Sequence, residues 1–103
     1  MSSNEEILEK VEEYGGGYVW EPEIFAVMLM ETPISDNQAV CLANLIGVHQ
    51  IAINCKNLSF TTLLNLASIP GLNSLVISES NLNQEQLRNL QAVGPEIEVE
   101  SNA

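Results

Sequence analysis

Few residues in this sequence could do chemistry, and none has a partner at a spacing typical of catalysis. His49 is the single histidine, and no acidic or nucleophilic residue is fixed near it to orient a general base. We therefore expect a solvated loop or edge histidine. Cys41 and Cys55 are too few for a disulfide scaffold and match no common zinc pattern. We expect partly exposed, unpaired thiols, with the adjacent Lys56 making Cys55 more reactive than a free thiol. A redox sensor is the alternative.

Carboxylates are the abundant ionisable groups, and they gather at the two ends of the chain. The chain has fourteen acidic and three basic residues, which gives a net charge of −11. Residues 1–31 carry −7 of this charge and residues 79–103 carry −4. A pair of glutamates could serve a hydrolase or bind Ca²⁺, but no calcium-loop motif or other residue organises them. We therefore predict no enzyme, no metal site and no cofactor, and we interpret the acidic ends as solubilising caps.

The acidic excess also limits the partners that the chain can have. Binding to a nucleic-acid backbone or to an anionic membrane surface requires Lys and Arg, which are scarce here. The N-terminus is acidic where a secretory signal would be basic. The longest apolar run, Ile24 to Met30, has seven residues, against the roughly 20 that a membrane helix needs. We predict a cytoplasmic protein with neither a nucleic-acid nor a membrane partner.

The elements that must position these residues follow a period of 24 residues. From Ile24 onward the chain divides into the rows 24–47, 48–71 and 72–95, and Gly47 and Gly71 close the first two. Five columns of apolar residues agree across the rows: Val27, Ile51 and Leu75; Leu29, Ile53 and Ile77; Ile34, Leu58 and Leu82; Leu42, Leu66 and Leu90; Leu45, Ile69 and Val93. Such columns predict a repeated structural unit with a shared core.

Within each row the hydrophobic period changes from that of a strand to that of a helix. The first two columns stand two residues apart in every row, and this alternation predicts a short strand with one buried face. The later apolar residues follow a helical spacing, and Ser35, Ser59 and Asn83 stand where the helix N-cap would be. Residues 96–100 alternate again after Gly94-Pro95 and predict a closing strand.

Residues 1–23 are predicted to cap the repeats. Apolar residues recur at helical spacing through 4–13, and Ser3-x-x-Glu6 has the spacing of a capping box. Gly15-Gly16-Gly17 predicts a loop or hinge. The aromatic residues around it predict a plug at one end of the core, with a ligand-stacking pocket as the alternative: Tyr14, Tyr18, Trp20 and Phe25.

The rows resemble leucine-rich repeats over residues 24–99. Leu72-x-x-Leu75-x-Ile77-x-x-Ser80-x-Leu82 follows the family pattern L-x-x-L-x-L-x-x-N-x-L, and so does Val48-x-x-Ile51-x-Ile53-x-x-Lys56-x-Leu58. The first row, Val27-x-Leu29-x-x-Thr32-x-Ile34-Ser35-Asp36, resembles the bacterial variant. The resemblance implies an α/β fold: a short solenoid with a parallel sheet on one face, helices on the other and an N-terminal capping helix, in a single domain. It also implies a role in binding partners and no chemistry.

The chain departs from the family pattern where the family places Asn, Cys or Thr, whose side chains bond backbone groups between coils. This position holds Thr32, Lys56 and Ser80. Because lysine has no acceptor, we expect either that Asn57 or Asn81, one residue along, replaces it or that the turn is less regular.

A sheet with helices on one side only leaves its other face open. The residues that alternate with the core positions would lie there, and Met28, Ala52, Val76 and Glu98 form the middle line. An exposed apolar line of this kind suits an adaptable contact surface. The alternative is that Tyr18, Trp20 or the first helix folds across this face. The candidate partner-binding residues are Met28, Met30, Gln50, Ala52, Asn54, Ser74, Val76, Ser78, Glu96 and Glu98.

These features predict a non-enzymatic protein–protein interaction module, either a monomer or a homodimer. A basic protein partner is favoured because an acidic chain speeds encounter with basic surfaces. Three alternatives stay open: an acidic inhibitor or immunity-type protein that blocks a basic partner, a self-associating homodimeric structural protein, and a carboxylate-dependent hydrolase.

Overall fold

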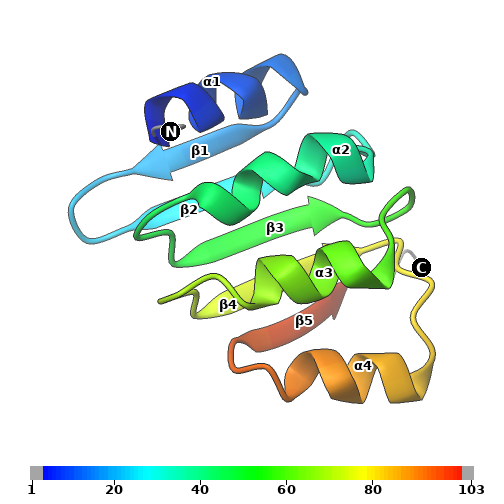
Figure 1. Ribbon diagram of the computed structural model, residues 1–103. Coiled ribbons are helices and arrows are strands. Elements are labelled where there is room, and N and C mark those ends of the chain that lie inside the picture. Colours follow the sequence, from blue (N-terminus) through cyan, green and yellow to red (C-terminus); the bar gives the residue numbers. More distant parts are fainter. Residues whose placement is uncertain (1–3, 101–103) are drawn as a thin grey trace.

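The computed structural model describes residues 4–100 of the chain (Figure 1). Helices and strands alternate along most of this length. In chain order the elements are α1 (Asn4–Glu13), β1 (Gly17–Trp20), β2 (Phe25–Leu29), α2 (Asp36–Ala39), the 3₁₀ helix η1 (Val40–Asn44), β3 (Gln50–Asn54), α3 (Phe60–Ala67), β4 (Ser74–Ser78), α4 (Gln84–Gln91) and β5 (Glu96–Glu100).

The five strands of the described chain form one mixed sheet in the order of the sequence, β1-β2-β3-β4-β5. Strands β2 to β5 are parallel, and β1 pairs antiparallel with β2. Val27 lies opposite Ile51, which lies opposite Leu75, so the 24-residue columns of the sequence are neighbours in the sheet. Parallel neighbouring strands were the expectation for these rows, and this expectation is confirmed.

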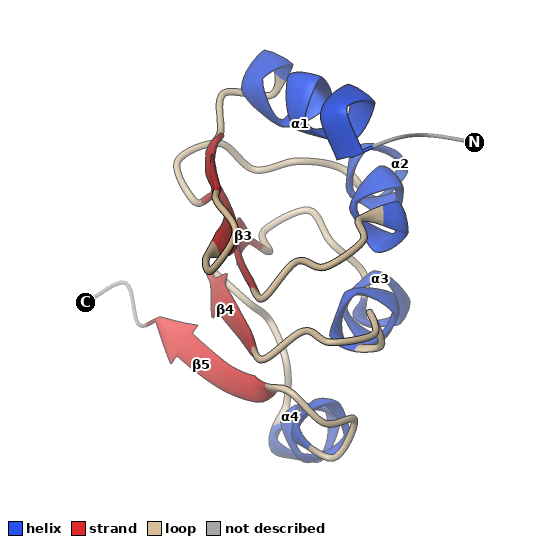
Figure 2. Cartoon of the chain, turned by 90° about the vertical axis from the view of Figure 1, so that its left-hand side faces the viewer, coloured by secondary structure: helices blue, strands red, loops and turns tan. Residues whose placement is uncertain are grey.

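The helices all lie on one side of the sheet, and the other face is free of them (Figure 2). α1 stands at the end of this helical layer, where it buries Ile7, Leu8 and Val11 in the common core. Asn4 fixes its start: the side chain donates to the carbonyl oxygen of Ile46 and accepts from the same residue's N–H, both at 2.9 Å. The first helix therefore does not fold across the open face.

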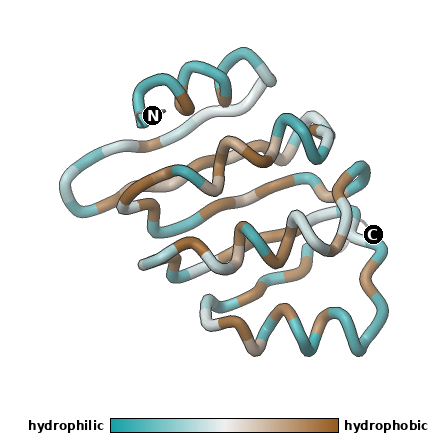
Figure 3. Tube along the Cα trace, viewed as in Figure 1, coloured by the Kyte–Doolittle hydropathy of each residue, from teal (hydrophilic) through white to brown (hydrophobic). Residues whose placement is uncertain are grey.

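The core lies between the sheet and the helices and includes buried apolar residues of both. Apolar positions recur along the strands and along the helices (Figure 3). The column of Leu42, Leu66 and Leu90 is fully buried. The last column is only partly as predicted, because Val93 follows the end of α4 and is 39% exposed. Val40, another apolar residue of the first row, is 58% exposed. It lies at the point where α2 ends after four residues and the chain continues as η1.

The three predicted N-caps are confirmed. Ser35, Ser59 and Asn83 each accept a hydrogen bond from the backbone N–H three residues along, which satisfies a donor that the helix itself leaves free. At Ser35 and Asn83 the backbone N–H of the cap residue in turn donates to the side-chain oxygen of a glutamine three residues along. The capping box proposed at Ser3 lies outside the described residues.

The segment after the glycines differs from the prediction, because Gly17–Trp20 is a strand and not part of a loop. Opposed residues of an antiparallel pair share a face, so Tyr18, which is paired with Val27, lies on the helix side. The negative charge of Glu12 on α1 raises the pKa of Tyr18, which agrees with this placement. The expected plug is wrong in this respect: Trp20 stacks on buried Phe25 at 5.6 Å but is itself 46% exposed.

Candidate functional site

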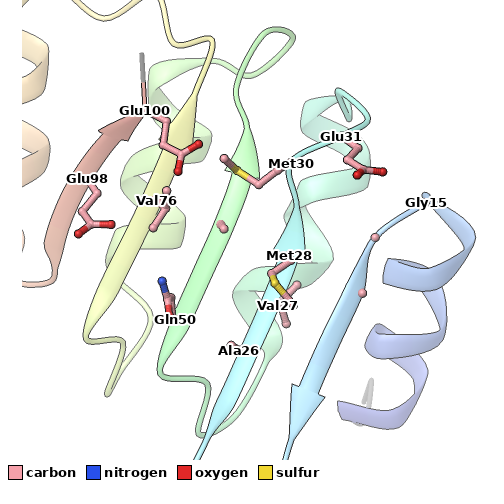
Figure 4. Close-up of a pocket in the computed structure, with 13 residues that line it drawn as sticks. Gly15, Ala26, Val27, Met28, Met30, Glu31, Gln50, Val76, Glu98 and Glu100 are labelled. Carbon is pink, nitrogen blue, oxygen red and sulfur yellow. The ribbon is translucent and has the colours of Figure 1, made fainter. Parts of the chain in front are cut away.

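The open face of the sheet carries a groove of about 500 Å³ that receives residues from all five strands (Figure 4). Side chains alternate between the two faces along each strand, and the parallel register brings equivalent positions side by side. The groove is lined by Gly15, Gly16, Gly17, Ala26, Val27, Met28, Met30, Glu31, Gln50, Ala52, Val76, Glu98 and Glu100.

The floor of the groove is apolar. The middle line of the sequence prediction is present as a row of neighbours, with Met28 opposite Ala52, Ala52 opposite Val76 and Val76 opposite Glu98. Met28 is 45% exposed and Ala52 is half-buried. Val76 is only 5% exposed although it lies outside the core cluster. The exposed apolar part of the floor is therefore centred on Met28 and not on Val76.

The structure brings together six of the ten predicted site residues. Met28, Met30, Gln50, Ala52, Val76 and Glu98 line the groove. The other four lie on the same strands but not in the groove: Asn54, Ser74, Ser78 and Glu96. Of these, Asn54 and Ser78 are buried at 4% and 5% exposure, so they are components of the sheet and offer little contact area.

The three glycines at one end of the groove, Gly15 to Gly17, were not among the predicted site residues. A Cβ on Gly16 would lie 2.4 Å from Leu29 Cδ2 and 2.5 Å from the carbonyl oxygen of Met28, so no side chain fits there. Gly17 lies opposite Met28 and has nothing within 4 Å of where its Cβ would be. The absence of a side chain at Gly17 leaves this end open. The run of three glycines in the sequence was the signal that could have indicated this open end.

The two ends of the apolar floor are acidic. Glu31 follows β2, whereas Glu98 and Glu100 project from β5, and Met28, Met30 and Val76 lie between them (Figure 4). All three glutamates are exposed, and no Lys or Arg lines the groove. The site therefore combines a methionine-rich floor with negative charge on both sides.

Asn54 takes the bridging role that the sequence assigned to a neighbouring asparagine. Its amide group donates to the carbonyl oxygen of Met30 at 3.3 Å and to the Glu79 carboxylate, and its Oδ1 accepts from the N–H of Lys56 at 3.0 Å. Asn57 and Asn81, the expected replacements, are both exposed. The Asn54 bonds hold the end of β3 to its neighbours beside the groove.

The expectation for Cys55 is wrong. It is 2% exposed, and burial raises the pKa of its thiol to about 12, so it is neither accessible nor activated. Cys41 is half-buried, as expected, and burial raises the pKa of its thiol as well. Both thiols are free.

His49 lies just before β3 and is half-buried. Its Nδ1 accepts from the backbone N–H of Phe25 at 3.1 Å, so its ring proton is on Nε2. The His49 backbone also forms hydrogen bonds with Phe25 and Asn73, one row of the sequence on either side. The imidazole thus joins the start of β2 to the segment just before β3, away from the groove.

Within residues 4–100, no group of three or more His, Cys, Asp or Glu side chains is placed to hold a metal ion. None of the helices in this range has the length and apolar character that a membrane span requires. Comparison of the chain with protein-family models, curated proteins and solved structures finds no match.

Proposed function

We propose that this protein is a non-enzymatic interaction module of leucine-rich-repeat type, and that it binds a partner protein on the open face of its sheet. The binding residues are those of the groove, with Met28, Met30 and Ala52 as its apolar contacts and Gln50 and Glu98 beside them. The repeat assignment is supported by the parallel register of β2, β3 and β4, and by the N-caps at equivalent positions of each row.

The open apolar groove is the observation that carries this proposal. Parallel sheets are ordinarily covered on both faces, whereas here no described helix lies over the face that carries Met28 and Ala52. Methionine side chains are flexible and polarizable, and they adapt to the shape of a partner. A groove of this kind favours a binding surface that is completed by another chain.

The reactive groups support binding over catalysis. The Cys55 thiol is buried and its pKa is raised, and the Nδ1 of His49 already accepts a backbone N–H. The hydrolase alternative would need a carboxyl group in an apolar pocket to serve as the general acid. The groove glutamates, Glu31, Glu98 and Glu100, are instead all exposed.

The test compares the partners captured by matched variants. Ala52→Tyr adds a large neutral side chain to the groove floor, and aromatic residues are common in β-strands. Val40→Tyr makes a similar addition at a 58% exposed site on the helical side. Each variant and the wild type would serve as bait in an extract of the native cell, with bound proteins quantified by mass spectrometry.

We expect at least one protein that the wild type and Val40→Tyr retain and that Ala52→Tyr loses. Equal retention by all three baits would place any binding elsewhere and contradict the proposal. Sedimentation of the same proteins tests the homodimer: self-association abolished by Ala52→Tyr alone would make the partner a second copy.

A further inference from the structure

The groove restricts the conformation of whatever occupies it. Its floor is built on β2, β3 and β4, each of which has a neighbouring strand on both sides. Their backbone N–H and C=O groups are therefore engaged within the sheet. An extended peptide lying on this face would leave its own backbone groups without partners, whereas a helix satisfies them internally.

The dimensions of the groove agree with a short helix laid across the strands. Its acidic ends stand just after β2 and on β5, and these two strands are three positions apart in the sheet. At about 4.8 Å per strand this is roughly 14 Å, and a helix covers that distance in about nine residues. Cationic side chains about seven or eleven residues apart lie on one face of such a helix and bracket this distance, so they would reach Glu31 at one end and Glu98 or Glu100 at the other.

The lining also restricts the chemistry of the occupant. Met28, Met30 and Ala52 favour an apolar stripe, and the exposed glutamates at both ends favour flanking cations. An acidic or neutral helix would desolvate these carboxylates without compensating their charge. Charge complementarity and the methionine floor together favour a helix that has an apolar stripe flanked by cationic side chains.

We propose that the groove binds a basic amphipathic helix of the partner protein. The apolar stripe of this helix lies on Met28, Met30 and Ala52, and its Lys or Arg side chains pair with Glu31 on one side and with Glu98 and Glu100 on the other. This inference rests on the proposed function, because it assigns an occupant to the same groove.

The experiment uses synthetic peptides of about 18 residues, long enough to form a helix once bound. The probe is a Leu/Lys/Ala amphipathic peptide with lysines flanking a leucine stripe. Two controls have the same leucines: one has glutamate in place of lysine, and one has a central proline pair that prevents the helix. Fluorescence anisotropy gives the affinity, and circular dichroism shows whether the peptide becomes helical on binding.

Three protein variants locate the binding. Gly17→Leu fills the open end of the groove, and nothing lies within 4 Å of the Cβ position, so thermal unfolding should be that of the wild type. We expect it to weaken binding of the lysine peptide about tenfold or more. Glu98→Gln and Glu23→Gln remove one charge each, but Glu23 does not line the groove. Only Glu98→Gln should weaken binding, and more so at low salt.

The inference is overturned if the lysine peptide does not bind, if the proline or glutamate peptide binds equally well, or if Gly17→Leu leaves the affinity unchanged. The proposed function has a separate readout, because Ala52→Tyr is tested on captured proteins and not on peptides. Loss of a captured protein without peptide binding would keep the groove as the site and reject the basic helix.

Discussion

The two cysteines differ in their surroundings, and these surroundings determine which thiol a reagent can reach. Cys55 lies directly after β3, is 2% exposed and donates through Sγ to the carbonyl oxygen of Ile53. Cys41 is half-buried in η1 and donates to the carbonyl oxygen of Gln38. A thiol reacts as its thiolate, and at neutral pH a pKa of about 12 leaves Cys55 almost entirely protonated.

We predict that iodoacetamide at neutral pH modifies Cys41 faster than Cys55. Burial raises the pKa of both thiols, so Cys41 should also react slowly compared with a free thiol. Cys55 should become reactive only in denaturant, because unfolding removes both its burial and its raised pKa. Peptide mass spectrometry over a time course measures the two rates, and faster modification of Cys55 in the native protein would contradict the structure.

The position of a residue in the 24-residue row predicts its exposure and its hydrogen bonds only in part. Cys55 has the same repeat position as Glu31 and Glu79, both of which are exposed, and this pattern led to the wrong expectation for the thiol. The exposure of a residue depends on which side chains of the neighbouring row cover it, and the sequence of one row does not contain this information. The bridging role of Asn54 could not be inferred for the same reason, since its acceptors belong to Met30 and Glu79 in adjacent coils.

Among the elements, α2 and α3 are joined at their N-termini through Asp36. Its Oδ1 accepts from the N–H of Ser59 and from the hydroxyl of Thr62, both at 2.8 Å. Asp36 also lies in the first turn of α2, where the helix dipole favours negative charge. The hydrogen bond from the Ser59 backbone, followed by that from Thr62, lowers the pKa of Asp36 from its ordinary value of 3.8.

This lowered pKa predicts a pH-dependent contribution of Asp36 to stability. The folded protein binds the proton less readily than the unfolded chain, so the carboxylate stabilises the fold above about pH 4 and loses this effect as the pH falls through the folded-state pKa. Asp36→Asn keeps an acceptor oxygen and removes the charge. We expect the variant to be less stable at pH 7, and the difference from the wild type to shrink below pH 4. Urea unfolding across this range measures it, and a difference independent of pH would refute a charge effect.

The buried columns of the core give a second prediction, which concerns the packing of strands against helices. Ile53 on β3 and Leu66 on α3 are both 0% exposed, so Ile53→Ala and Leu66→Ala should each destabilise the fold by about 2–5 kcal/mol. Val93→Ala is the matched control, because Val93 belongs to a predicted core column but is 39% exposed, and it should cost less than about 1 kcal/mol. Denaturant unfolding measures the loss in free energy of unfolding for each of the three variants. Equal losses would show that burial does not determine the cost of these substitutions.

Elements fixed by local signals were predictable, and those that depend on distant pairing were not. Strand alternation and the N-cap residues lie within a few positions of one another, so β3, β4 and the starts of α2, α3 and α4 follow from the sequence. β1 was missed because its preceding glycines favour a loop. Its strand conformation comes from antiparallel pairing with β2, beyond the turn at Glu21–Ile24.

At the scale of the molecule, the register is what makes the candidate site predictable. Because Met28, Ala52 and Val76 are equivalent residues of successive rows, the sequence showed that they share a face. It did not show the concavity of the sheet, nor that α1 joins the helical layer and leaves this face open. These features arise from packing between elements, and they turn a row of side chains into a groove that is left open beside Gly17 and carries glutamates on both sides of its apolar floor.

The constant step between β2, β3 and β4 leads us to predict that the molecule can be lengthened from within. A second copy of residues 48–71 placed after Gly71 would join Gly71 to Val48, a junction equivalent to the existing Gly47–Val48, and would end in the existing Gly71–Leu72. We expect the enlarged protein to fold cooperatively, with one more strand and helix, and with a face wider by about 4.8 Å. Small-angle scattering and circular dichroism would measure this growth, and an aggregated or partly unfolded product would show that the coils are not interchangeable.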